Sequence, residues 1–145
     1  MALYGPRSDE FMTVSTSTNT DRQVAPSAGW TTHLSRSFTT SVRGPIIATG
    51  SIAQAYEQGA VNAYCRFQLD SGTHSETMAL GIQRDSNRMD HGSGSYFYNF
   101  ADIAAGSHTV YFQVYTVSGS YMRVGGPHNP GSGNQMDVLC VMYLA

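Results

Sequence analysis

Much of this chain consists of short segments in which apolar side chains occupy every second position. The clearest is "VNAYCRFQL" at 61–69, in which Val61, Ala63, Cys65, Phe67 and Leu69 share one parity. Successive side chains of a strand point to opposite faces of a sheet, so this period of two predicts a strand with one buried face. No stretch of the sequence keeps an apolar helical period for three turns. The pattern therefore predicts an all-β fold.

The number and spacing of the segments narrow the fold class further. Further alternating segments include "WTTHLSRSF" (30–38), "YFYNFADI" (96–103), "GSHTVYFQV" (106–114) and "QMDVLCVMYLA" (135–145). About eight antiparallel strands with turn signals roughly every ten residues are typical of a single jelly-roll β-sandwich. A chain of 145 residues has the usual length of one domain with one core.

Several residues carry more specific expectations. Trp30 shares the parity of Leu34 and Phe38, which predicts a core tryptophan. Gly50 lies inside a strand-like segment and predicts a bulge or a close approach. The "DSGT" turn at 70–73 predicts a positive φ at Gly72 and a bond from the Asp70 side chain to the backbone ahead of it. Two polar, glycine-containing stretches, 84–95 and 125–134, predict exposed loops.

The first 28 residues differ in composition from the rest of the chain. They are rich in Ser, Thr, Asn and charged residues and contain few apolar side chains, too few to offset the entropy of ordering the segment. We therefore expect an extended N-terminal arm over residues 1–28 and a β-sandwich domain over 29–145. The arm is expected to contact a neighbouring protein chain through Tyr4, Phe11, Met12 and Val14.

The last segment is apolar at both parities. We expect Cys140 and Met142 to face the interior, and Leu139, Val141 and Tyr143 to face outward into a subunit interface, because a sheet face with three apolar side chains calls for a partner. Cys65 and Cys140 both have apolar neighbours two positions away and no secretory context, so they are expected to be reduced and buried.

Composition and motifs argue against several classes of function. The net charge is −2 and only 12% of residues are charged, without the basic surface that a nucleic-acid binder needs. The first residues contain no apolar run typical of a signal peptide or a membrane helix. Carboxylates and histidines show no catalytic or metal-ligand spacing, and the glycine-rich runs lack the context of a phosphate loop. No enzyme activity, metal or cofactor is therefore expected.

Three segments in order carry a resemblance to a known family. They are "AYCRFQLDSGTHSETMALGI", "ADIAAGSHTVYFQVYTVSGSYMRV" and the terminal "MDVLCVMYLA". Over roughly residues 29–145 they resemble the jelly-roll domains of tailed-phage virion proteins, in which a "DG" hairpin, an "LxAGxHTV" hairpin and a final "LxVxxL" strand recur. The topology of those domains is similar to the trimeric tumour-necrosis-factor and C1q folds. Here "LDSGT" replaces the usual "DG" pair and lengthens the turn.

The resemblance implies a homotrimer in which the apolar outer face of one sheet packs around a threefold axis. Combined with the side-chain pattern, it predicts a structural virion protein, made in the host cytoplasm, that decorates and stabilises the capsid surface. Its expected partners are itself, the major capsid protein and neighbouring decoration subunits, with the trimer interface formed by Leu139, Val141, Tyr143, Tyr111, Tyr115 and Tyr64.

Two alternatives remain open at this point. The domain can be the receptor- or carbohydrate-binding tip of a phage tail or head fibre, or a free-standing carbohydrate-binding module. Both make use of exposed aromatic rings that stack on sugars, which would make a glycan a further partner. The candidates for such stacking are Trp30, Tyr64, Tyr96, Tyr98, Tyr111, Tyr115 and Tyr121.

Overall fold

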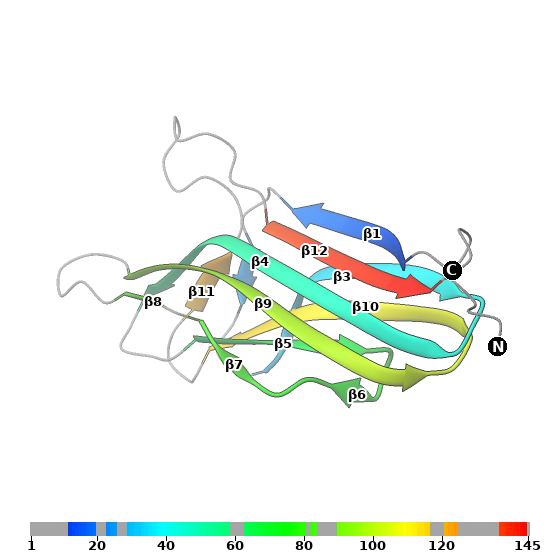
Figure 1. Ribbon diagram of the computed structural model, residues 1–145. Coiled ribbons are helices and arrows are strands. Elements are labelled where there is room, and N and C mark those ends of the chain that lie inside the picture. The colour runs from blue at the N-terminus through cyan, green and yellow to red at the C-terminus, as the bar shows by residue number, and fades with distance from the viewer. Residues whose placement is uncertain are drawn as a thin grey trace, which may run out of the picture.

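The computed structural model describes residues 12–19, 23–25, 29–58, 63–80, 82–83, 90–116, 121–124 and 137–144. All of its regular elements are strands, and they form two antiparallel sheets packed face to face (Figure 1). The predicted all-β sandwich is confirmed. The strands, in chain order, are β1 (Met12–Asn19), β2 (Gln23–Ala25), β3 (Thr31–Thr40), β4 (Gly44–Gln58), β5 (Ala63–Leu69), β6 (Thr73–His74), β7 (Met78–Ala79), β8 (Ile82–Gln83), β9 (Asp90–Ile103), β10 (Gly106–Thr116), β11 (Tyr121–Val124) and β12 (Asp137–Leu144).

The topology is that of a jelly roll. In the seven-stranded sheet, β1 pairs with β12, β12 with β4, and β4 with β9; β2, β8 and β11 extend this sheet. In the five-stranded sheet, β3 pairs with β10, β10 with β5, and β5 with β6 and β7. The pairs β1 with β12, β3 with β10, β4 with β9 and β5 with β7 are nested in the sequence, as in a long hairpin folded over into two sheets.

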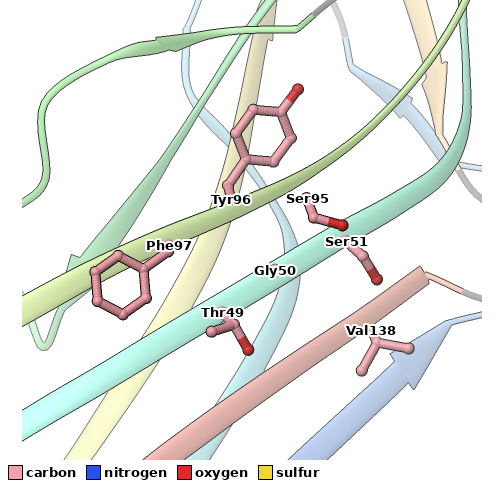
Figure 2. A pocket seen from close by; sticks show the side chains of 7 residues that line it. All are labelled: Thr49, Gly50, Ser51, Ser95, Tyr96, Phe97 and Val138. Carbon is pink, nitrogen blue, oxygen red and sulfur yellow. The ribbon is translucent and has the colours of Figure 1, made fainter.

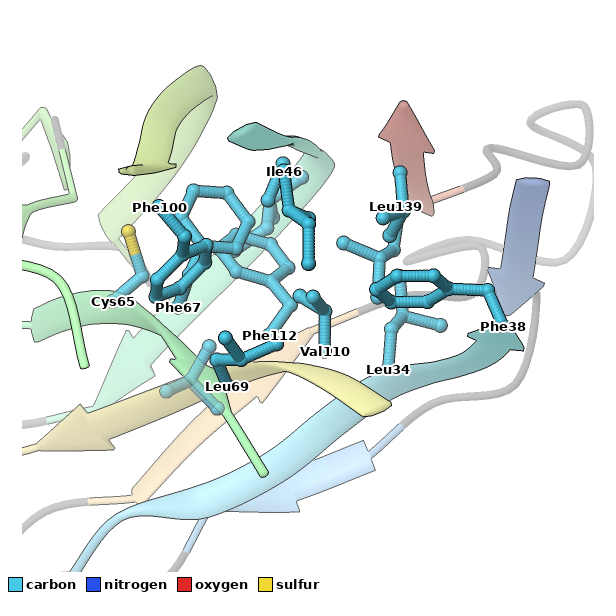
Figure 3. Close-up of a cluster of buried hydrophobic side chains, with 14 of the residues drawn as sticks. Leu34, Phe38, Ile46, Cys65, Phe67, Leu69, Phe100, Val110, Phe112 and Leu139 are labelled. Carbon is cyan, nitrogen blue, oxygen red and sulfur yellow. The ribbon is translucent and has the colours of Figure 1, made fainter. Parts of the chain in front are cut away.

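The core lies between the two sheets and is rich in aromatic rings (Figure 3). Phe67 and Phe112, from neighbouring strands of the five-stranded sheet, stack with ring centroids 4.9 Å apart. Phe38 packs on Tyr143 of the opposite sheet at 4.6 Å. Gly50 of β4 faces these rings, and a Cβ added there would lie 3.0 Å from carbons of both Phe112 and Phe67. The expectation of a close approach at Gly50 is therefore confirmed.

The faces of β12 are the reverse of those expected from the sequence. Leu139 and Val141 are 0% exposed and Tyr143 is also buried, so all three belong to the sandwich core. The alternate side chains are half-buried on the outer face: Val138, Cys140, Met142 and Leu144. The prediction that Leu139, Val141 and Tyr143 face a partner is wrong. Both parities are apolar, so alternation alone did not say which face turns inward.

The two cysteines lie in different environments. Both are free thiols, as expected. Cys65 is buried between the sheets, and burial raises the pKa of its thiol to about 12, which makes it unreactive at neutral pH. Cys140 points to the outer face of the seven-stranded sheet and is only half-buried. The prediction of two interior thiols is thus correct for Cys65 and wrong for Cys140.

The described part of the expected arm is paired within its own chain. Strand β1 pairs antiparallel with β12 along its whole length, from Met12 opposite Leu144 to Asn19 opposite Asp137, and β2 pairs with β11. Residues 12–19 and 23–25 are therefore strands of the sandwich, which corrects their assignment to an arm outside the domain. Backbone bonds to a neighbouring strand supply the order that their few apolar side chains cannot.

Three further expectations need correction. Trp30 is half-buried outside the core cluster, because its ring packs on the outer side of the five-stranded sheet. In the turn at 70–73 the positive φ belongs to Asp70, at 51°, and Gly72 does not share it. Residues 90–95, expected in an exposed loop, begin β9 and pair with β4. Residues 84–89 and 125–134 lie outside the described residues.

Candidate functional site

The outer face of the seven-stranded sheet carries partly exposed apolar side chains. Phe97 is 61% exposed, and the half-buried side chains of Ile47 and of alternate residues of β12 lie across the same face. In register, Phe97 of β9 is opposite Thr49 of β4, which is opposite Cys140 of β12. We call this surface the apolar face and define it by its partly exposed apolar residues: Ile47, Phe97, Val138, Cys140, Met142 and Leu144.

A shallow hollow of about 260 Å³ lies on the apolar face (Figure 2). The side chains of Phe97, Thr49 and Val138 border it from β9, β4 and β12. Ser51 and Ser95 complete its rim, whereas Tyr96 leaves β9 on the opposite side from Phe97. The border is thus largely apolar with small hydroxyl groups between, and no described carboxylate or guanidinium lines it. A protein surface suits such a hollow better than a charged ligand does.

The outer face of the five-stranded sheet has a different chemistry. The ring of Trp30 lies 5.4 Å from that of Tyr115, and Tyr115 stacks with Tyr64 at 6.3 Å. The guanidinium of Arg66 lies 4.3 Å over the Trp30 ring, and its Nε donates a 2.8 Å hydrogen bond to Oε1 of Gln113. We call this group of Trp30, Tyr64, Arg66, Gln113 and Tyr115 the aromatic face.

The structure does not bring together the residues predicted for one trimer interface. Tyr64, Tyr111 and Tyr115 are half-buried on the outer side of the five-stranded sheet. The outer surface of β12 belongs to the other sheet, and Leu139, Val141 and Tyr143 lie in the core between the two. One flat interface cannot include all six residues.

Of the predicted arm contacts, Tyr4 and Phe11 lie outside the described residues, and Met12 and Val14 stand in β1 opposite Leu144 and Met142.

The two motifs behind the sequence resemblance contact each other. Asp70 of the "DSGT" turn accepts hydrogen bonds from the backbone N–H of Thr109 and from Nδ1 of His108, both at 2.8 Å. Nε2 of His108 lies 2.9 Å from the carbonyl oxygen of Ala104. The bond expected from Asp70 to the backbone thus runs across to the next hairpin. Asp70 and the "AGSHTV" segment therefore form a clamp that holds two turns at one end of the sandwich.

The clamp gives a pH dependence with a defined sign. The hydrogen bond to Asp70 raises the pKa of His108 above its ordinary value of 6.5. Because the pKa of His108 is higher in the folded state, the protonated imidazole stabilises the fold. This contribution is fully present below about pH 6.5 and is lost as the pH rises through the raised pKa. We expect Asp70→Asn, which keeps an acceptor for Thr109, to lose stability mainly at low pH. Urea midpoints at about pH 5.5 and about pH 8.5 test this, and an equal loss at both would contradict it.

A second histidine–carboxylate pair is buried in the interior, and sequence reasoning missed it. Nε2 of His33 lies 2.6 Å from Oδ2 of Asp137, and both side chains are 0% exposed. The register between β10 and β3 shifts between Phe112 and Gln113, next to His33. An extra residue at such a bulge re-aims its side chain, so His33 turns inward instead of following the alternation. The pair bridges the two sheets, because β3 and β12 belong to different ones.

The described residues offer little that resembles a catalytic or metal site. Among the described residues, the ring nitrogens of His108 contact Asp70 and the Ala104 carbonyl and no serine or cysteine nucleophile, and the solvent-inaccessible His33–Asp137 pair is out of reach of a substrate. Within the same residues, no group of three His, Cys, Asp or Glu side chains could hold a metal ion. The described part of the chain also contains no helix that is long and apolar enough to cross a membrane.

Comparison with known proteins gives little further guidance. No family model matches the chain, and no curated protein matches it. Among solved structures, it is similar to a chain in the structure of the infectious bursal disease virus Gx strain. The identity is 12% and the TM-score 0.39, and the match covers 100% of this chain and 43% of that chain. It is also similar to the infectious bursal disease virus VP2 subviral particle, with 11% identity and a TM-score of 0.40 over 92% of this chain and 37% of that one. The chain spans less than half the length of either, and similarity of this extent carries no inference about function.

Proposed function

We propose that this protein is a structural, non-enzymatic component of a virus particle that assembles into homotrimers through the apolar face of its seven-stranded sheet. The observation that carries the proposal is the apolar face itself, with Phe97 61% exposed at the outer edge of a hollow bordered by Val138. Its partly exposed apolar side chains lie on three neighbouring strands of one sheet, which is typical of a subunit contact. The sequence resemblance to trimeric jelly-roll virion proteins supplies the threefold arrangement.

The proposed role is that of a decoration, or cement, protein on the outside of a phage capsid. A small sandwich with few charges and no catalytic group on its described surface adds contacts between capsid subunits without a chemical step. The residues before β1 would contact the major capsid protein or a neighbouring trimer. Quantitative mass spectrometry of purified particles separates this role from that of a fibre tip: hundreds of copies per particle support decoration, whereas only a few copies would contradict it.

The interface is tested by placing a charge on the apolar face. Phe97→Glu should leave the monomer folded, because this side chain is already 61% exposed, but it should raise the dissociation constant of the oligomer about thirtyfold or more, as loss of an aromatic hot-spot contact does. Sedimentation velocity over a dilution series measures the shift. Met142→Glu tests the same face from β12, at a half-buried position.

A matched control is available at Val42, the other large apolar residue found exposed among the described residues, at 46%. It lies in the turn between β3 and β4 and is not among the residues that define the apolar face, so Val42→Glu should leave the oligomer unchanged. If Phe97→Glu and Met142→Glu both sediment like the parent at micromolar concentration, the apolar face is not the interface.

A further inference from the structure

We propose that the aromatic face of the five-stranded sheet is a second binding site, which recognises an acidic sugar, that is, a carbohydrate bearing a carboxylate. The site consists of Trp30, Tyr64, Arg66, Gln113 and Tyr115, on the opposite side of the sandwich from the apolar face. The proposal does not depend on the oligomer, because the two surfaces belong to different sheets.

The rings provide a broad apolar platform. Tyr64 and Tyr115 are direct cross-strand partners on β5 and β10, and Trp30 adjoins Tyr115 from the start of β3. All three side chains are half-buried, so each packs against its neighbours and keeps part of its ring in solvent. The C–H faces of a pyranose ring pack on aromatic surfaces of this kind, while its hydroxyls reach the polar groups alongside.

Arg66 supplies the charge that selects an acidic ligand. The described residues place no carboxylate within ion-pair distance of its guanidinium, which is held by Gln113 and by the Trp30 ring. Arg43, by contrast, already makes a two-point ion pair with Asp102, at 2.6 and 2.5 Å. An arginine whose Nε is fixed by a side-chain amide keeps its terminal N–H groups for a carboxylate, which it binds at two points.

The shape of the surface favours a sugar over an acidic peptide. Peptides commonly bind by adding a strand to a sheet edge or by inserting side chains into a groove. The aromatic face lies on the flat surface of the sheet and not at its edge, because β10 is paired with β3 on one side and with β5 on the other. Gln113 is nearly covered there, with 9% exposed. Tyrosine hydroxyls, an amide and a guanidinium beside flat rings are complementary to a hydroxylated ring with one carboxylate.

The experiment uses the full chain and its own fluorescence, because Trp30 is the single tryptophan. The protein is titrated with oligogalacturonate, with a neutral oligogalactose of equal length and with poly-glutamate, and calorimetry provides a second readout. Oligogalacturonate should change the Trp30 emission saturably and release or absorb heat, whereas the other two should bind at least about tenfold more weakly, since each lacks either the charge or the ring.

Two variants test the role of Arg66. Arg66→Gln should weaken oligogalacturonate binding about tenfold or more, as loss of a charge-assisted bond does, and Arg66→Lys should recover part of it. Arg43→Gln, which removes an arginine already paired with Asp102, should leave binding unchanged; calorimetry follows all three. The proposal fails if oligogalacturonate does not bind, if poly-glutamate or the neutral sugar binds equally well, or if a folded Arg66→Gln variant keeps full affinity.

Discussion

Asp137→Ala is expected to lower the free energy of unfolding by about 3–5 kcal/mol, the usual cost of breaking a buried pair of polar or charged groups. Both side chains of the His33–Asp137 pair are 0% exposed, His33 Nε2 lies 2.6 Å from Asp137 Oδ2, and His33 Nδ1 has no hydrogen-bond partner among the described residues. Without Asp137 the whole imidazole would be buried with no described hydrogen bond at either nitrogen. A domain of this size has about 5–15 kcal/mol of stability, so the variant should be near the limit of folding.

The double variant His33→Leu with Asp137→Leu distinguishes loss of the pair from general damage to the core. Replacing both polar groups by apolar ones leaves nothing unpaired, so most of the lost stability should return. Urea denaturation at fixed protein concentration measures both variants, because dilution of an oligomer also changes stability. The pair would have no stabilising role if the single variant lost less than about 0.5 kcal/mol, the range of a neutral surface change.

Gly50→Ala is expected to be the most damaging single-methyl change in the core, with a loss of about 1–3 kcal/mol. The added Cβ would lie 3.0 Å from ring carbons of Phe112 and Phe67, which stack on each other and are both 0% exposed. Neither ring can move away without disturbing the other. Thermal or urea unfolding measures the loss, which should come with a lower midpoint and an unchanged slope.

Gly72→Ala is the matched control for this change. Nothing lies within 4 Å of a Cβ added at Gly72, and its φ is outside the left-handed region that disfavours side chains. The alanine should therefore be neutral or stabilise by about 0.4–1 kcal/mol, because it restricts the unfolded chain. Equal effects at positions 50 and 72 would show that the rings do not set the requirement for glycine.

The alternation of side chains predicted features that depend on residues close together in the sequence, such as which side chains of a strand share a face. Strand β5 alternates buried and half-buried residues from Ala63 to Leu69, as its sequence pattern indicated. Strand β12 alternates equally well, yet its faces were assigned the wrong way round. Its inner parity includes Asp137, a residue that seldom lies in a core. The burial of Asp137 depends on His33, which is 104 positions away in the sequence and turned inward by a bulge.

The candidate surfaces were predictable in kind but not in composition. The tyrosines of β5 and β10 were correctly placed together on an outer face, since their parity is opposite to that of Phe67 and Phe112. An apolar outer surface on β12 was also expected, but its residues were not identified. The sequence pattern does not single out Arg66, because its contacts are with Trp30 and Gln113, which belong to two other segments. The alternation within a strand shows which side chains share a face. The contacts between side chains of different strands also depend on how the strands pair.

Sedimentation equilibrium of the unmodified chain is a direct test of the proposed trimer. In that trimer, the apolar face, with Phe97 61% exposed, is covered by two further copies of the protein. At micromolar concentration the measured mass should be three times the 15.7 kDa of one chain, and dilution should shift it toward the single-chain mass. A mass of one chain that does not change with concentration would rule out this trimer.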